Sequence, residues 1–126
     1  MAGALRDESA LPAFDPAVLT ALVDALQDSS ATERFVRAYL AMLPTRVGRI
    51  QDAVGRDDPT AAMDAVLSLK VSSATVGARQ LQALACDLEA HLRGHVLVPA
   101  CEVASRLTAA ADRTRCDLER HLGLPA

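Results

Sequence analysis

Aromatic residues are almost absent from this chain of 126 residues. It has no tryptophan, one tyrosine and two phenylalanines, although hydrophobic residues make up 51% of the sequence. Any core must therefore be filled by alanine, leucine and valine. Strands favour aromatic and β-branched side chains, which are scarce here apart from valine, whereas alanine and leucine are strong helix formers. The composition predicts an all-α protein of one domain.

An excess of one charge and long apolar runs are also missing. The 13 basic and 16 acidic residues are interspersed and leave a net charge of −3, which argues against a nucleic-acid or anionic-membrane surface. No apolar run approaches the ~20 residues that span a bilayer. The first ten residues mix Arg6, Asp7 and Glu8 with small residues, unlike a signal peptide. We therefore expect a cytoplasmic protein with no nucleic-acid or membrane partner.

Motifs for metal binding and catalysis are missing as well. Cys86, Cys101 and Cys116 are an odd number without C-x-x-C spacing, so we expect free thiols. The sequence contains no paired carboxylates, Ser-His-Asp set, H-E-x-x-H motif or glycine-rich phosphate loop. We predict no enzymatic activity, no cofactor and no metal site.

Apolar residues at steps of three and four predict a series of helices. Residues 1–13 lack this periodicity and are expected to form a flexible tail, followed by a helical bundle over 14–122 and a short tail over 123–126. Asp15-Pro16 and Asp58-Pro59 have the form of a capping carboxylate followed by proline in the first turn. A short helix from Pro16 to about Asp28 should precede helices over about 30–54, 59–76, 78–93 and 99–122.

Capping and breaking residues set the expected helix limits. Ser30 or Thr32 can cap the second helix, and Pro44 inside it should bend it or remove one hydrogen bond. Gly55, Gly77 and Gly94 should end the second, third and fourth helices. The expected core positions of the second, fourth and fifth helices are Phe35, Tyr39, Met42, Leu43, Val47, Ile50 and Val54; Leu81, Leu84, Leu88 and Leu92; and Val103, Leu107, Ala111, Thr114 and Leu118. Four long amphipathic helices with short connections predict an antiparallel four-helix bundle, with the short first helix across one end.

The third and fourth helices contain a more specific pattern, Leu67-Ser-Leu-Lys-Val-Ser-Ser-Ala-Thr-Val-Gly-Ala78, followed by Leu81, Leu84, Leu88 and Glu89. It resembles the signature of histidine-containing phosphotransfer (HPt) domains, which reads His-x-Leu-Lys-Gly-Ser-Ser/Ala, x-x-x-Gly-Ala, x-x-Leu-x-x-Leu and later Leu-Glu. The likeness covers about residues 14–122. It implies an HPt-like bundle and a role in two-component or phosphorelay signalling, with a receiver domain or a sensor kinase as partner.

Two positions depart from this signature. In the family, a surface imidazole exchanges a phosphoryl group with a receiver-domain aspartate, the lysine three residues later lies nearby, and the glycine four residues later leaves room for the partner. Here Leu67 stands at the histidine position and Val71 at the glycine position. Leucine has no nucleophilic atom, so transfer cannot occur at this position. Lys70 is then expected to be a solvated lysine, because the group that it would assist is missing.

A helical wheel of the third helix separates two apolar faces. Ala62, Val66, Leu69, Ser73 and Val76 form the expected core stripe. On the opposite side, Met63, Leu67, Val71 and Ala74 form a second apolar strip flanked by Asp64, Ser68 and Lys70. The first helix or the N-terminal segment could cover this strip, or the strip could be a remnant of a site no longer in use. We favour an exposed docking surface made by Met63, Leu67, Lys70, Val71 and Ala74.

Three hypotheses follow from these patterns. The favoured one is a non-catalytic pseudo-HPt protein that binds a receiver domain, a kinase or a second copy of itself. The second is a phosphocarrier that uses His91, His95 or His121, none of which has a Lys-Gly-Ser context. The third is a helical scaffold or a binder of an apolar ligand, unrelated to signalling.

Overall fold

The computed structural model describes residues 8–123, which contain helices and no β-strand. No helix in this range is long and apolar enough to cross a membrane. The elements in chain order are a 3₁₀ turn η1 (Glu8–Ala10) and the helices α1 (Pro16–Leu26), α2 (Ser29–Gly55), α3 (Pro59–Val76), α4 (Arg79–Arg93), α5 (Leu97–Ser105) and α6 (Leu107–Leu122).

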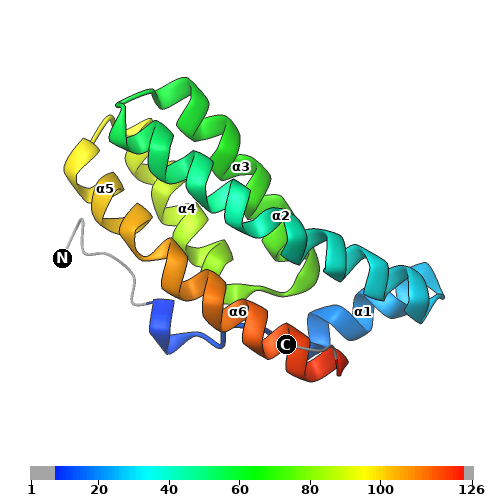
Figure 1. The fold of residues 1–126 in the computed structure, drawn as a ribbon. Coiled ribbons are helices and arrows are strands. Elements are labelled where there is room, and N and C mark those ends of the chain that lie inside the picture. Colours follow the sequence, from blue (N-terminus) through cyan, green and yellow to red (C-terminus); the bar gives the residue numbers. More distant parts are fainter. Residues whose placement is uncertain (1–7, 124–126) are drawn as a thin grey trace.

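The helices form an antiparallel bundle, as Figure 1 shows. Its four rods are α2, α3, α4 and the α5–α6 pair; α3 packs between α2 and α4, and α6 packs on α2 and α4. The N-terminal part of α2 extends beyond the other rods, and α1 lies against it at that end. The predicted all-α bundle with a short additional N-terminal helix is confirmed. Its core consists mainly of fully buried leucine and valine side chains, including Leu43, Leu69, Leu84, Leu88 and Leu118.

Aspartate caps begin three of the helices. Asp15 Oδ1 accepts a hydrogen bond from the main-chain N–H of Ala17, and Asp58 Oδ1 accepts one from Ala61, as expected. The cap of α2 is different from the predicted Ser30 or Thr32. Asp28 Oδ1 accepts from the N–H groups of Ser30 and Ala31, so the helix begins one residue earlier than Ser30. A carboxylate is as good a cap as a hydroxyl, and here it comes first in the chain.

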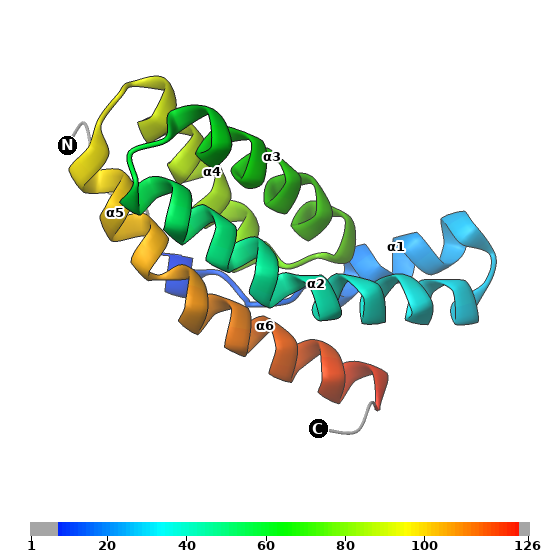
Figure 2. The same ribbon diagram turned by 45° about the horizontal axis from the view of Figure 1, so that its top comes forward.

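Pro44 bends α2 without ending it. Proline has no N–H to donate to the carbonyl of the residue four positions earlier, which is Leu40. That carbonyl instead accepts a hydrogen bond of 3.0 Å from Arg115 Nη2 on α6. Figure 2 shows the two halves of α2 running in different directions. The predicted bend is confirmed, and a side chain from another helix satisfies the carbonyl group that the proline leaves open.

The buried face of α2 differs from the expected one at two positions. Phe35 and Met42 are 41% and 49% exposed, whereas Val36 and Leu40 are buried. Apolar residues stand side by side at these points, so periodicity alone did not decide which of them faces the core. In α4, α5 and α6, the expected core residues are buried except for Leu92 and Ala111, which are partly buried.

The expected helix over 99–122 is interrupted at Arg106. Ser105 Oγ donates a 2.6 Å hydrogen bond to the carbonyl of Glu102, and the N–H of Arg106 bonds to Val103 instead of Glu102. A serine hydroxyl that competes for a carbonyl of the preceding turn often bends a helix. The prediction of one continuous helix from Pro99 to about Leu122 was therefore wrong. The first part begins at Leu97, and Gln51 of α2 donates to both sides of the break, at the Ala104 carbonyl and the Thr108 hydroxyl.

Part of the segment expected to be a tail packs on the bundle. Glu8 is buried and its carboxylate lies 3.2 Å from Arg106 Nη1. Gln80 Nε2 donates to the carbonyl of Leu11, and Gln80 Oε1 accepts from Arg113 Nε. Residues 8–13 therefore pack on α4 and on Arg106 at the junction of α5 and α6, which the lack of periodicity did not suggest. At the other end Gly123 caps α6, and the remaining parts of both expected tails, 1–7 and 124–126, lie outside the described residues.

Candidate functional site

The two apolar faces of α3 lie where the helical wheel predicted them. All five residues of the core stripe have an exposed fraction of 0%. On the opposite face Leu67 is 36% and Val71 64% exposed, with Met63 and Ala74 partly buried beside them. This set of four is called the Leu67 strip below. Since Leu67 and Val71 are exposed, α1 and residues 8–14 do not cover the centre of the strip.

The strip is bordered on the α4 side by an ion-pair network. Lys70 Nζ lies 2.6 Å from Glu89 Oε1, and Arg93 Nη2 lies 2.7 Å from Glu89 Oε2. The hydrogen bond from Lys70, followed by that from Arg93, lowers the pKa of Glu89, and the bond to Glu89 raises the pKa of Lys70. Lys70 therefore has a fixed acidic partner on α4, which the sequence did not predict, although its side chain remains 35% exposed to solvent. Each of the two oppositely charged groups favours the ionised form of the other.

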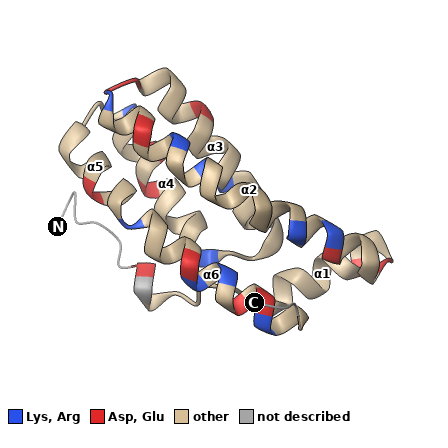
Figure 3. Ribbon diagram, in the orientation of Figure 1, with Lys and Arg blue, Asp and Glu red and all other residues tan. Residues whose placement is uncertain are grey.

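A groove of about 360 Å³ runs along the other side of the strip, between α2 and α3. Its floor includes the small residues Ala53, Ala61 and Ala65, which leave the space between the helices unfilled at the surface. Its walls carry charged and polar side chains: Arg46, Arg49, Asp52 and Arg56 from α2, and Asp64 and Ser68 from α3. Figure 3 shows basic residues along this part of α2. Sequence reasoning missed this groove, although Met42, Arg46, Arg49, Ala53 and Arg56 recur at helical steps.

Hydrogen bonds behind the strip fix α3 to α2. The Tyr39 hydroxyl and the Ser73 hydroxyl lie 2.8 Å apart in the core. Burial raises the pKa of Tyr39 to about 12, so this phenol is neutral at physiological pH. Nearer the surface, Arg46 Nη1 donates to Ser72 Oγ at 2.6 Å. The two serines of the Lys-x-Ser-Ser sequence thus join α2 at two depths, one inside the core and one at the edge of the groove.

The turn after α3 depends on Gly77. Its φ of +83° lies in the left-handed region, and an added Cβ would come within 2.7 Å of the Asp15 carbonyl and 2.9 Å of Val18 Cβ. The Gly77 carbonyl accepts the N–H of Asp15 at 2.8 Å, and the Asp15 carboxylate accepts from Arg79. The glycine therefore permits both the turn and the close approach of the N-terminal segment. Gly77 and Gly94 end α3 and α4 as predicted.

None of the three histidines joins the Leu67 strip. His91 and His95 line a separate hollow of about 230 Å³, together with Asp57, Leu92, Val96 and Leu97. His121 packs against Phe14, with ring centroids 5.1 Å apart in an edge-on arrangement. Within residues 8–123, no group of three histidine, cysteine, aspartate or glutamate side chains is placed to hold a metal ion. The strip and its two charged borders are the candidate functional site.

The bundle belongs to a class of small helical domains, and comparison with known proteins identifies the family. The model of the Hpt domain matches residues 34–115, so the chain belongs to the Hpt domain family. Hpt domains are phosphotransfer carriers that interact with receiver domains or kinases in phosphorelays. The match links this chain to phosphorelay signalling.

A solved structure has the same fold. It is the HPT domain from the Hpt sensor hybrid histidine kinase from Shewanella, with a TM-score of 0.67 and 21% sequence identity, and the alignment covers 87% of this chain and 97% of that one. At this identity the similarity concerns the fold alone. A comparison with curated proteins found no matching sequence.

Proposed function

We propose that this chain is a non-catalytic pseudo-HPt protein, which binds a receiver domain of a phosphorelay through the Leu67 strip without taking up its phosphoryl group. The observation that carries the proposal is the exposed Leu67 side chain at the position where the HPt signature has its histidine. Phosphotransfer would need a lone pair at this position to form a bond to phosphorus as the bond to the aspartate breaks. A leucine side chain has none.

The surroundings of Leu67 support a docking role. Val71, at the family's glycine position, is 64% exposed and adds a second apolar side chain one turn away. The strip is bordered by charged groups on both sides, which is the usual composition of a protein interface with an apolar centre and a polar rim. Exposed apolar patches with polar borders on small proteins commonly mark such interfaces. A kinase or a second copy of the chain are the other partners that the strip could accept.

The proposal is tested by incubating the protein with receiver domains of the same organism that carry a radiolabelled aspartyl phosphate. We expect the wild-type protein to bind a receiver and to acquire no label. The variant Leu67→His/Val71→Gly, which rebuilds the signature, should acquire an acid-labile phosphoryl group. Label on His91, His95 or His121 of the wild type would favour the carrier hypothesis. Absence of binding to any receiver would favour a scaffold, and an unlabelled double variant would contradict the assignment of position 67.

A further inference from the structure

Most arginines in the described part of the chain have an oxygen acceptor. Arg113 and Arg115 donate to the Gln80 side-chain oxygen and the Leu40 carbonyl. Arg34, Arg46 and Arg49 are the described arginines with neither a carboxylate nor a carbonyl acceptor. Those that contact a carboxylate are Arg37, Arg56, Arg79, Arg93, Arg106 and Arg120.

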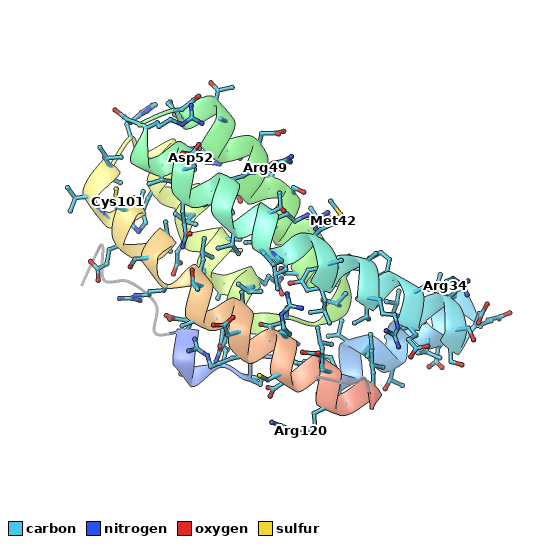
Figure 4. The ribbon with its side chains drawn as sticks, viewed as in Figure 1. Arg34, Met42, Arg49, Asp52, Cys101 and Arg120 are labelled. Carbon is cyan, nitrogen blue, oxygen red and sulfur yellow. The ribbon has the colours of Figure 1, made fainter. Side chains whose placement is uncertain are left out.

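Two of these three arginines line the groove beside the Leu67 strip. Arg46 and Arg49 lie three residues apart on α2, so their side chains project from the same face of the helix. Ser72 and the Met42 sulfur accept from Arg46 at 2.6 and 3.8 Å, which orients its guanidinium group without neutralising it. Figure 4 shows Arg49 near Met42 and Asp52 on the part of α2 inside the bundle, and Arg34 on the protruding part.

The acidic residues of the groove do not neutralise this pair. Asp52 Oδ2 accepts from Arg56 Nε at 2.9 Å. Asp64 stands on the α3 wall and is exposed, and among the described residues it forms no ion pair with Arg46 or Arg49. Arg46 and Arg49 thus face a groove of about 360 Å³ whose lining carries three arginines and two aspartates, and neither aspartate forms an ion pair with them among the described residues. Arginine forks match the geometry of phosphoryl oxygens, which they bind through paired charge-assisted hydrogen bonds.

We infer that Arg46 and Arg49 bind the phosphoryl group of an aspartyl phosphate while it remains on the receiver domain docked at the Leu67 strip. This inference rests on the proposed function. Ser68, which lines the groove, directly follows Leu67 in the sequence, and Ser72, which positions Arg46, directly follows Val71. A receiver seated on the strip therefore has its contact surface next to the two arginines. The chain would distinguish a phosphorylated receiver from an unphosphorylated one, without removing the phosphoryl group.

The anion site is tested first with inorganic phosphate, which needs no partner protein. Titration of the ¹⁵N-labelled protein, followed by NMR of the arginine Nε–H groups, should shift the Arg46 and Arg49 signals and leave Arg34 unchanged. Arg49→Gln should weaken phosphate binding about tenfold, because one charge-assisted contact is lost. Arg34→Gln is the matched control from an exposed position on the same helix. Equal shifts at all exposed arginines, or unaltered binding in Arg49→Gln, would overturn the inference.

The second test uses a receiver domain with and without beryllofluoride, a stable mimic of the aspartyl phosphate. We expect wild-type protein and Arg34→Gln to bind the beryllofluoride form about tenfold more tightly, and Arg49→Gln to lose this preference. Equal affinity of the wild type for both forms would overturn the inference and leave the proposed function in place. If neither form binds at all, the proposed function fails, and a phosphate site found in the first test would then not belong to a receiver complex.

Discussion

The residues on and behind the Leu67 strip differ in how strongly the fold depends on them. Ser73 holds Tyr39 in the core and Gly77 permits a turn that an alanine would strain, so changes at these positions cost folding free energy. Leu67 and Val71 are on the outer face, where substitutions usually change the stability by less than about 0.5 kcal/mol. An exposed reactive position can therefore change without loss of the fold.

The Lys70–Glu89 pair makes a pH-dependent contribution to stability. The pKa of Glu89 lies below its ordinary value of 4.5, because Lys70 and Arg93 donate to its ionised form. Its contribution is present above pH 4.5 and is lost as the pH falls through the lowered pKa. We expect wild-type protein to be more stable than Glu89→Gln at pH 7, and the difference to shrink towards pH 3, as measured by urea denaturation.

A matched control for this experiment is Glu119→Gln, since Glu119 forms no ion pair with a basic side chain in the described part of the chain. At high pH, the stabilisation that comes from Lys70 should be lost. The pKa of Lys70 is raised above 10.5, so its contribution is complete below that value and is lost as the pH rises through the raised pKa. A stability difference between wild type and Glu89→Gln that does not change from pH 7 to pH 3 would show that the pair has no such role.

The bend of α2 at Pro44 is accompanied by a contact with α6. Arg115→Ala leaves the Leu40 carbonyl without its hydrogen-bond donor and should lower the free energy of unfolding by about 1 to 3 kcal/mol. In Pro44→Ala, the new main-chain N–H can bond to that carbonyl, so Arg115→Ala should cost less in this background. Urea denaturation of the wild type, both single variants and the double variant measures the difference. If Arg115→Ala lowers the free energy of unfolding equally in both backgrounds, the contribution of the arginine contact does not depend on the proline.

Most of the element structure could be predicted from the sequence, because helix periodicity and caps are local signals. The core stripe of α3 and the stops at Gly77 and Gly94 are examples. The break at Arg106 could not be predicted, since no glycine or proline marks it and the feature that accompanies it is a hydrogen bond from a serine hydroxyl. The packing of residues 8–13 on the bundle could not be predicted either, because its hydrogen-bond partners lie far along the chain, such as Arg106 for Glu8.

The candidate site was predictable only in part, for a similar reason. The Leu67 strip lies on one helix, so a helical wheel finds it. The groove beside it requires Arg46 and Arg49 from α2 and the small residues of α3 to be brought together, and the pairing of Lys70 with Glu89 connects two helices. The residue pattern within one helix does not show which residues of a neighbouring helix lie beside it. The sequence of α2 did contain one signal, the recurrence of arginine at helical steps.

At the scale of the whole molecule, the position of the strip predicts how the protein recognises its partner. Burial of an exposed leucine or valine contributes about 1.5 to 3 kcal/mol, so Leu67→Asp and Val71→Asp should each weaken receiver binding at least tenfold, an effect of about 1.4 kcal/mol or more. Val98→Asp is the matched control, because Val98 is 78% exposed and lies on α5. Affinity is measured by calorimetry, with the melting temperature recorded in parallel. Unchanged affinity in folded strip variants would exclude the strip as the docking surface.

The attachment of the N-terminal segment to the turn after α3 also affects how the molecule folds. The Asp15 carboxylate and Arg79 are 64 positions apart, whereas α3 and α4 are joined by a short turn. Contacts that close long loops are costly to form early, so neighbouring helices should associate first and the segment before α2 should dock late. Interactions made after the rate-limiting barrier act mainly on the unfolding rate. We therefore expect the contacts of Asp15 with Gly77 and Arg79 to lower the unfolding rate of the bundle more than they raise its folding rate.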